Sequence, residues 1–380
     1  MNTVVKSVIK CGIGVLGGAF AVMKLAPIER RVVIMSRQSN KPSQDIEMLR
    51  DELENRNIDT VVMCKKMGDG LGGKVAYLGE LGRQMKYLAS SKVVVLDSYN
   101  IPVSLFKHRD KTKVIQMWHA LGAMKKFSRS ILDMPEGKSS ELANLMKMHA
   151  GYDYIFTSSE ASRPAFAEAF GYPEDKLTIM SLPRVDALLD EKRNAELAVQ
   201  IKTEYPQLED RETIVYAPTL RVGKDMSKFV SDLITAVNNC KFKFSLVIKM
   251  HPLTEISLDD NLPENIIIDN KFQTAEMFAI ADYVITDYSA ITYEVALKGL
   301  PIYFYAFDKD EYLDGRTFYL DYDKDMPGPI CATADEVMAE LTSGTKTEEY
   351  RKKAKAFADK YIEKQSGCTA EIADLIEELL

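Results

Sequence analysis

The sequence is poor in the residues that build disulfide frameworks and metal sites. Its 380 residues include five cysteines and four histidines. The cysteines are odd in number and scattered, without CxxC spacing, which predicts reduced thiols in a cytoplasmic protein. Neither a zinc-ligand spacing nor HExxH is present, so no metal site is expected, and nothing predicts a bound cofactor.

Catalytic fingerprints of two large enzyme classes are absent too. The sequence has no GxxxxGK[ST] phosphate-binding loop, which argues against an ATP-type enzyme. It has no GxSxG, which argues against a hydrolase with a serine nucleophile. The formal net charge is −7. General binding of nucleic acid is therefore not expected, and any contact with a polyanion has to be local.

The N-terminus holds the one compositional anomaly. Residues 11–23 carry no charge and lie between Lys10 and Lys24. This stretch is shorter than the roughly 20 residues that cross a bilayer, and it lacks the cleavage pattern of a secretory signal peptide. We expect a helix within residues 1–28 that binds the cytoplasmic side of the membrane surface through residues 1–27. Docking of this helix on the protein's own body is the alternative.

From residue 31, short apolar segments alternate with segments of helical spacing. Examples of the apolar segments are VVIM at 32–35 and VVVL at 93–96. Strands that are apolar throughout and separated by helices predict parallel sheets covered on both faces. The alternation pauses in the charged stretch 190–212 and then restarts. The sequence therefore predicts an α/β fold with two Rossmann-like domains whose parallel sheets face each other across a cleft.

The expected boundaries follow from this alternation. An N-terminal Rossmann-like domain is expected at 29–190 and a linker at 191–212. A second Rossmann-like domain is expected at 213–345. Helices are expected at 346–380, and whether they pack on the first domain is left open.

Polar residues follow nearly every predicted strand. In open α/β sheets, ligands bind at the carboxyl ends of the strands. The segments to consider are 36–40, 97–100, 118–126, 157–160, 217–221, 249–252, 286–292 and 307–310.

The segment QMWHALGAMKKF, residues 116–127, holds the only tryptophan, Trp118, beside His119. A neutral imidazole at a strand end can take a proton from a hydroxyl nucleophile near pH 7. Lys125 and Lys126 offer positive charge to a phosphate. A structural histidine that bonds to the backbone is the plainer alternative.

The second half contains comparable segments. In LVIKMHP, strand alternation predicts that Lys249 and His251 share one face, which suits a diphosphate; a solvated pair is the alternative. In YAPTLR, Thr219 ends a strand and Arg221 begins a basic loop. Residues 307–329 form a long aromatic and acidic loop, a type that is usually functional, with Arg316 in its middle.

The segment ITDYSAITYEVAL predicts a helix that begins near Ser289. Ser289 is the expected N-cap, with free backbone N–H groups ahead of it for an anion. Glu294 is a candidate acceptor for hydrogen bonds from a diol. A plain cap, with Glu294 interacting with the helix dipole, is the alternative.

Taken in order, these segments resemble the CDP-glycerol glycerophosphotransferase family of Gram-positive teichoic acid synthesis. The motifs that carry the resemblance are QMWHALGAMKKF, IFTSSE, FGYPEDKLTIMSLPRVDAL, YAPTLR, KMHP, TDYSAITYE, YAFD, RTFYLD and MPGP. They run from about residue 30 to 345, and they are specific as a series.

The resemblance implies a GT-B fold in which the first domain binds acceptor and membrane and the second binds a CDP-polyol. It implies that His119 is the general base and that His251 lies near the donor diphosphate. The candidate donor-binding residues are Thr219, Arg221, Lys249, Asp287, Ser289, Thr292, Glu294, Asp308 and Arg316. The candidate acceptor-binding residues are Trp118, Lys125 and Lys126.

The implied activity is transfer of glycerol phosphate from CDP-glycerol to an undecaprenyl-type lipid-linked saccharide, with release of CMP. Ala120 and Ala290 replace a glycine and a serine of the family pattern, and they leave the polyol, glycerol or ribitol, open. The short N-terminal region favours priming over polymerisation. A glycosyltransferase that uses a nucleotide sugar and a non-catalytic membrane scaffold are the alternatives, and an oligomer is possible.

Overall fold

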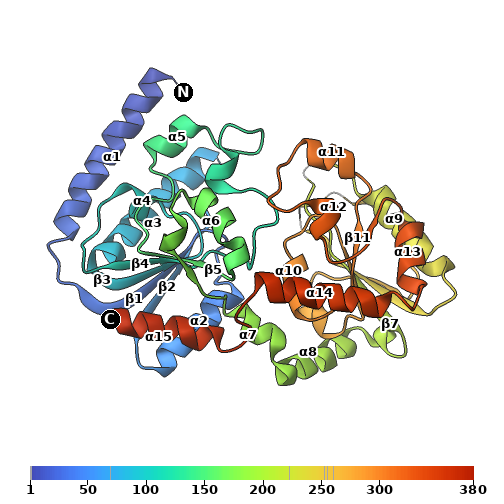
Figure 1. The fold of residues 1–380 in the computed structure, drawn as a ribbon. Coiled ribbons are helices and arrows are strands. Elements are labelled where there is room, and N and C mark those ends of the chain that lie inside the picture. Colours follow the sequence, from blue (N-terminus) through green and yellow to red (C-terminus); the bar gives the residue numbers. More distant parts are fainter. Residues whose placement is uncertain (1, 69, 222, 252, 255, 260) are drawn as a thin grey trace. The chain divides into compact units, whose positions relative to one another are not determined.

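The fold is described from a computed structural model that covers residues 2–380, apart from 69, 222, 252, 255 and 260 (Figure 1). The chain divides into two compact units. The first contains residues up to 121 together with 126–186 and 364–380. The second contains residues 122–125 and 187–363. The chain therefore passes between the units four times.

The first unit is built on a six-stranded parallel sheet with the order β2-β1-β3-β4-β5-β6. The inner strands are apolar and buried over 32–35, 93–96 and 114–115, because helices cover both faces of a parallel sheet. The bounds are β1 Glu29–Ser36, β2 Asp59–Cys64, β3 Ser91–Leu96, β4 Lys113–Gln116, β5 Tyr154–Thr157 and β6 Leu177–Ile179.

Helices of the first unit surround this sheet (Figure 1). Ser43 caps α2 and Asn100 caps α4 through their side chains, as polar residues do at helix starts. The bounds are α1 Thr3–Met23, α2 Gln44–Asn55, α3 Gly70–Ser90, α4 Ile101–Leu105, η1 Ser128–Ile131, α5 Ser140–Leu145, η2 Glu160–Ser162, α6 Arg163–Phe170, η3 Glu174–Lys176 and α15 Cys368–Leu379.

Helix α1 is longer than the uncharged stretch that predicted it. Its 21 residues make it long and apolar enough to cross a membrane, by length and composition only. Phe20 is buried against Phe106 of the same unit, with ring centroids 5.6 Å apart. Val8 and Val15 are exposed. The helix is thus anchored near its C-terminal end and leaves much of its apolar surface uncovered.

The second unit repeats the plan with a parallel sheet of order β12-β11-β10-β7-β8-β9. Its strands are β7 Glu212–Tyr216, β8 Phe244–Ile248, β9 Ile266–Ile268, β10 Tyr283–Thr286, β11 Ile302–Tyr305 and β12 Ile330–Cys331. Its helices are α8 Glu191–Glu204, η4 Pro206–Leu208, α9 Ser227–Asn239, η5 Glu276–Ala279, α10 Thr292–Leu297, α11 Lys309–Asp314, α12 Tyr322–Asp325, α13 Ala334–Thr342 and α14 Thr347–Tyr361; α7 Arg184–Leu189 contains the passage from first to second unit.

Each sheet has one point where the strand order reverses. In the first unit it lies between β1 and β3, and in the second between β7 and β10. Ligands of open α/β sheets bind outside the carboxyl ends of the strands at this switch point. The segments to examine are therefore 37–40 and 97–100 in the first unit, and 217–221 and 287–292 in the second.

The structure confirms the α/β class and the two parallel sheets, and it corrects several local expectations. Residues 191–208 are mostly helical and belong to the second unit. Residues 307–329 are not a structureless loop, because α11 and α12 form within them. Ser289 is not the N-cap of α10; Ile291 holds that position, and no side chain caps the helix.

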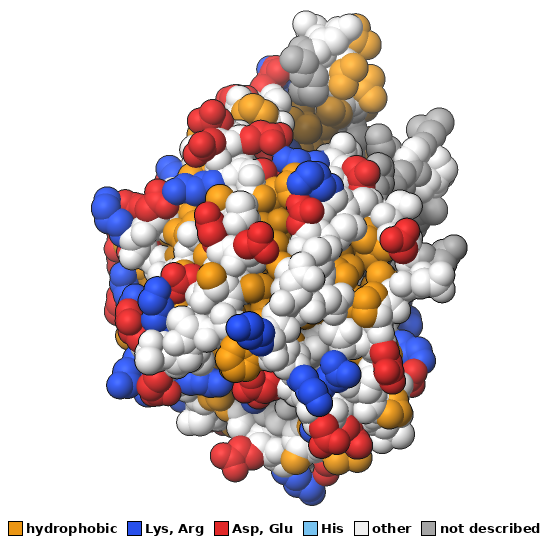
Figure 2. Space-filling model, turned by 90° about the vertical axis from the view of Figure 1, so that its right-hand side faces the viewer, with side chains coloured by type: hydrophobic (Ala, Val, Ile, Leu, Met, Phe, Trp, Pro, Cys, Tyr) orange, Lys and Arg blue, Asp and Glu red, His pale blue; other side chains and the backbone are white. Residues whose placement is uncertain are grey.

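One face of the molecule shows how charge is distributed. On the face drawn in Figure 2, acidic and basic side chains are intermingled, with hydrophobic side chains between them. A site for an anion therefore has to be sought in small clusters of side chains.

Candidate active site

Trp118 and His119 follow β4, and the backbone there is held in an unusual conformation. Trp118 has a φ of 64°, in the left-handed region that non-glycine residues rarely occupy. The buried side chain of Gln116 accepts a hydrogen bond from the Trp118 N–H at 3.0 Å and donates one to the Ser98 carbonyl at 3.2 Å. The positive φ falls on Trp118, and Ala120 is not among the described residues that have one. Replacement of the family's glycine by Ala120 therefore creates no backbone strain.

His119 is held in one tautomer. Its Nδ1 lies 2.7 Å from the backbone carbonyl oxygen of Asp97. Because a carbonyl oxygen only accepts, Nδ1 carries the proton and the lone pair is left on Nε2. Burial lowers the pKa of His119 below its usual range, so the ring is neutral at pH 7. The Gln38 amide nitrogen lies 3.5 Å from Nε2, a long and weak contact. A neutral imidazole with its lone pair on Nε2 is the form that a general base requires.

A pocket of about 390 Å³ opens beside His119 within the first unit. Residues after β1 and β3, the two strands at the switch point, contribute to it, so its place agrees with the general rule for open sheets. Its lining residues are Arg37, Gln38, Ser98, Tyr99, Trp118, His119, Phe127, Ser128, Ile131, Glu136, Gly137, Lys138, Met148 and His149.

His149 is a member of this pocket that the motif search missed. It is buried, has a φ of 64°, and its Nδ1 lies 2.9 Å from the Tyr152 hydroxyl. Burial, together with the positive charges of Arg129 and Lys138, lowers the pKa of His149 to about 3. Its ring meets the Trp118 ring edge-on, at 6.0 Å between centroids. His149 is therefore an uncharged residue in the pocket lining. It lies in the segment MKMHAGYD, which matches none of the motifs considered above.

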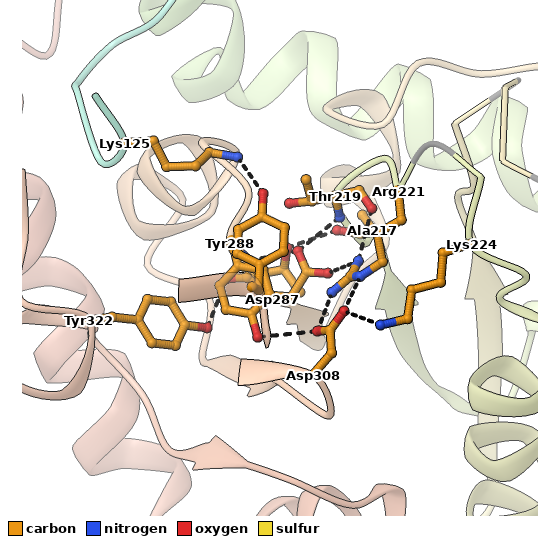
Figure 3. A network of polar contacts seen from close by, with 11 residues as sticks. Lys125, Ala217, Thr219, Arg221, Lys224, Asp287, Tyr288, Asp308 and Tyr322 are labelled. Atoms are coloured by element: carbon orange, nitrogen blue, oxygen red, sulfur yellow. Dashed lines mark hydrogen bonds and ion pairs between the residues drawn. The ribbon is translucent and has the colours of Figure 1, made fainter. Parts of the chain in front are cut away.

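In the second unit, Arg221 is the centre of a buried polar network at the switch point (Figure 3). Its guanidinium is bidentate to Asp308, at 2.7 and 2.9 Å, and donates to Asp287 at 2.7 Å and to the Thr219 carbonyl at 3.0 Å. Burial lowers the pKa of Arg221, but hydrogen bonds and the charges of Asp308 and Asp287 outweigh this effect and raise it. Its N–H donors are thus largely engaged.

The carboxylates of this network organise the loops around it. Asp287 accepts from the Thr219 N–H at 2.8 Å, and the Tyr322 hydroxyl donates to the Asp287 carbonyl at 3.1 Å. Lys224 pairs with Asp308 at 3.1 Å. Burial raises the pKa of Asp308, but Arg221 and Lys224 hold it below its usual range. The network fixes the ends of β7, β10 and β11 relative to one another.

Lys249 and His251 do not share a face. Strand β8 ends at Ile248, and the alternation on which the expectation depended ends with it. The Lys249 ammonium is buried and bonds to the Asp269 carboxylate and to two carbonyl oxygens, of Asp269 and Phe272. His251 is exposed, and its Nδ1 accepts from the Leu253 N–H at 3.1 Å. Pro252 of the HP motif lies outside the described residues.

Three further candidates lie on or before α10, a helix of only six residues. Ser289 accepts a hydrogen bond from the Thr292 hydroxyl through its carbonyl at 2.9 Å. Thr292 and Glu294 are buried. These residues stabilise the loop 287–292, which follows β10 at the switch point.

The two lysines that follow His119 lie in different surroundings. Lys125 belongs to the second unit, where its ammonium donates to the Tyr312 hydroxyl at 3.1 Å. Lys126 belongs to the first unit and pairs with Glu168 at 3.2 Å. Arg316 lies over the Tyr312 ring, 4.9 Å from its centroid. Among the described residues, no group of three or more His, Cys, Asp and Glu side chains is arranged to hold a metal ion.

Comparison with known proteins agrees with this architecture. Residues 19–378 match the family described as CDP-glycerol:poly(glycerophosphate) glycerophosphotransferase. The chain belongs to this family. The sequence-based assignment is thereby confirmed, and the chain is an enzyme of the glycerophosphotransferase family that contains the teichoic acid primases and polymerases.

Two relatives and one structure place the chain within the family. It is 30% identical to the teichoic acid ribitol-phosphate primase of Bacillus spizizenii, over 100% of this chain and 99% of that protein. It is 26% identical to the teichoic acid glycerol-phosphate primase of Bacillus subtilis, over 77% of this chain and 74% of that protein. The wall teichoic acid polymerase TagF has the same fold, with a TM-score of 0.74 at 21% identity over 100% of this chain and 98% of that one.

Proposed function

We propose that this enzyme moves glycerol phosphate from CDP-glycerol to a hydroxyl of a membrane lipid-linked saccharide and releases CMP, as a priming step in cell-wall polymer synthesis. The observation that carries the proposal is His119: its Nδ1–H is fixed on the Asp97 carbonyl, its Nε2 carries the lone pair with the Gln38 amide nitrogen 3.5 Å away, and its ring lines a pocket at a switch point. The family match supports the class of reaction.

In the proposed reaction, the acceptor hydroxyl gives its proton to His119 Nε2 and attacks the β-phosphorus of the donor. A new bond forms between the acceptor oxygen and phosphorus, and the bond from that phosphorus to the bridging oxygen breaks, so that CMP leaves with the electron pair. Positioned donors stabilise the charge on the transferring group. His251 is exposed, and because its Nδ1 accepts from the Leu253 N–H, its Nε2 carries the proton and can donate. It is the proposed contact to the donor diphosphate.

The donor site is proposed at the switch point of the second unit. The Thr219 Oγ1 is buried and has no hydrogen-bond partner among the described residues, so it can serve a phosphate oxygen. Ser289 and Arg316 are proposed as further donor contacts. Arg221 and Lys249, whose N–H groups are engaged, are positioning residues, as are Asp287, Asp308, Thr292 and Glu294.

CDP-ribitol is a second candidate donor. It is favoured by the end-to-end match with a ribitol-phosphate primase. The deciding experiment incubates the enzyme with each CDP-polyol and a synthetic undecaprenyl-type acceptor and weighs the products. The expected product carries one added glycerol phosphate. If only ribitol phosphate is added, the donor is CDP-ribitol instead. If many units are added, the enzyme is a polymerase and not a primase. UDP release from a UDP-sugar, without CMP release from either donor, contradicts the proposal.

Membrane association is proposed for α1. Its exposed valines support an apolar face, and Lys6, Lys10 and Lys24 support attraction to anionic lipid. In flotation with vesicles that contain anionic lipid, the full chain should float, and Val8→Asn combined with Val15→Asn should leave most of it unbound. Equal flotation of both forms contradicts a role for this face. The exposed Val199→Asn on α8 is the matched control.

A further inference from the structure

The pocket beside His119 contains two cations that lack a carboxylate partner. Arg37 follows β1 at the switch point, and Lys138 lies on the segment between η1 and α5. Among the residues that the structure describes, neither side chain forms an ion pair. Glu136 is the one carboxylate in the lining, and it is exposed, as is Lys138. Two unpaired cations in one pocket favour an anionic ligand.

Both cations rest on the same aromatic ring. The Arg37 guanidinium lies 5.7 Å and the Lys138 ammonium 5.9 Å from the centroid of Tyr99. Arg37 also donates to the Tyr99 carbonyl at 3.1 Å, which fixes the direction of its side chain. Partial burial and the nearby charge of Arg37 lower the pKa of Lys138. The protein thus holds two like charges together, an arrangement that an anion between them would stabilise.

Hydrogen-bonding capacity at the pocket is also unused. The Arg37 Nε and the Ser128 Oγ are buried and have no hydrogen-bond partner among the described residues. Unsatisfied buried polar atoms are rare in folded proteins and call for a ligand or water. A guanidinium is well suited to phosphate because it offers parallel N–H donors to two oxygens.

Backbone strain concentrates at the same place. Of the seven described non-glycine residues with positive φ, Trp118, Ser128 and His149 line this pocket. Such conformations cost free energy and persist where the surrounding structure enforces them, often at ligand sites. The pocket is therefore shaped by the fold and is not a chance surface depression.

We infer that Arg37 and Lys138 form a subsite for a phosphate of the acceptor, next to the hydroxyl that reacts. The inference rests on the proposed function, because it takes His119 as the base. The pocket is only about 390 Å³, so a phosphate at Arg37 is at most a sugar or polyol unit away from a hydroxyl at His119. The acceptor then already bears a phosphate ester close to its reactive end, and another phosphotransferase has to supply it.

The lysines expected to hold this phosphate are engaged elsewhere. Lys126 pairs with Glu168, and Lys125 bonds to the Tyr312 hydroxyl. The subsite is therefore assigned to Arg37 and Lys138. The sequence indicated only Arg37, which lies in the strand-end segment 36–40; it gave no signal for Lys138. This phosphate is either the phosphodiester of a terminal polyol phosphate or the diphosphate of a lipid-linked sugar, and both present the same oxygens.

Trp118 provides a direct test because it is the only tryptophan and lines the pocket. Titration of the full chain with glycerophosphoglycerol, and separately with a short prenyl diphosphate-linked N-acetylglucosamine, should change its fluorescence saturably with at least one of the two. The ester that binds identifies the source of the phosphate. Free glycerol should have no effect. If neither ester gives a saturable change, the subsite does not exist.

Substitutions assign the binding to the two cations. Arg37→Gln and Lys138→Gln should each weaken binding of the ester by about tenfold or more, because each removes hydrogen bonds between a cation and the phosphate. Lys86→Gln, at an exposed position of α3, is the control and should bind like the wild type. Wild-type affinity in both pocket variants overturns the inference.

Kinetics separates this inference from the proposed function. With a lipid-linked acceptor that carries the binding ester, both pocket variants should raise the KM for acceptor about tenfold and leave the KM for CDP-polyol unchanged. An equal rise in both KM values shows general damage and contradicts the assignment. If the wild type releases no CMP yet the ester binds through Arg37 and Lys138, the proposed reaction fails while the anion subsite stands.

Discussion

At the scale of single residues, the state of the polar side chains depends on the hydrogen bonds they make to carbonyl groups and carboxylates. His119 owes its tautomer to a main-chain carbonyl, and Arg221 and Lys249 are occupied by carboxylates and carbonyls of their own unit. The sequence indicated His119 because a motif and a strand end coincide there. It could not indicate that Lys249 turns inward, because the alternation rule ends where the strand ends, nor that His149 joins the pocket, because no motif contains it.

His119 should govern the pH dependence of turnover. In the proposed reaction its neutral form is the active one, and its lowered pKa keeps that form populated below the usual imidazole value of about 6.5. The kcat/KM of the wild type should therefore stay level from pH 8 down to about 6.5 and fall only at lower pH.

His119→Ala should lower kcat by about 100-fold or more with donor affinity retained. A wild-type rate in this variant removes His119 from the mechanism.

Asp97 should make the protein less stable as the pH rises. Burial raises the pKa of Asp97 to about 6, above its usual value near 3.8. Between these values the folded state holds a proton that the unfolded state has released, so the free energy of unfolding falls with rising pH. The difference of about two pH units corresponds to about 3 kcal/mol at pH 7.5.

Asp97→Asn removes this titration and should raise the Tm at pH 7.5, with a gain that shrinks toward pH 4. Thermal unfolding at the two pH values measures it. A Tm difference that is the same at both values, or a less stable variant at pH 7.5, contradicts the role assigned to the Asp97 charge.

At the scale of elements, the sequence predicted best what burial dictates. The central residues of β1 (32–35), β3 (93–96) and β10 (284–285) are apolar and buried because both faces of a parallel sheet are covered, and this pattern is visible without a structure. Helix starts were predicted less well. The Ser289 hydroxyl accepts only a long contact, 3.4 Å, from the Ile291 N–H, so α10 starts later than a serine cap would place it.

Only the structure shows that the short segment 122–125 belongs to a different unit from its neighbours in the chain. It belongs to the second unit although the residues on either side belong to the first. A Cβ at Gly122 would lie 2.3 Å from the ring of the buried Tyr293. Gly122→Ala should therefore destabilise the protein by about 1–3 kcal/mol, the usual cost of overpacking.

Gly79→Ala is the matched control for this substitution. Gly79 lies inside α3, and a Cβ added there would have nothing within 4 Å, so alanine should stabilise the helix by about 0.5–1 kcal/mol. Urea unfolding of both variants gives the comparison. Equal effects of the two substitutions would contradict the close approach at Gly122.

At the scale of the whole molecule, the last helix completes the first unit. Asp186 accepts hydrogen bonds from the backbone N–H groups of Cys368 at 3.0 Å and Thr369 at 2.8 Å, and Arg56 of the α2 C-cap pairs with Asp374 at 2.6 Å. Cys368 and Ile372 are fully buried. Sequence periodicity predicted the helix but not its neighbour, because contacts between distant segments leave no local pattern.

Ile372→Ala should lower the stability of the first unit by about 2–5 kcal/mol, as large-to-small changes in cores do. Trp118 belongs to that unit, so its fluorescence in a urea titration reports the transition. The exposed Glu378→Ala on the same helix should leave the midpoint unchanged. A midpoint unaffected by Ile372→Ala would show that α15 contributes little.

The repeated passage of the chain between its units limits how relatives can be recombined. A chimera joined once, at residue 187, would mismatch both units: the second would contain 122–125 of the other protein, and the first would contain 364–380 of the other protein. To exchange the whole second unit, where the donor site is proposed, a designer has to transplant 122–125 together with 187–363 and leave the terminal helix native. A hybrid built that way keeps the partners of Tyr293 and of Asp186 intact, and its donor selectivity can be attributed to the transplanted unit.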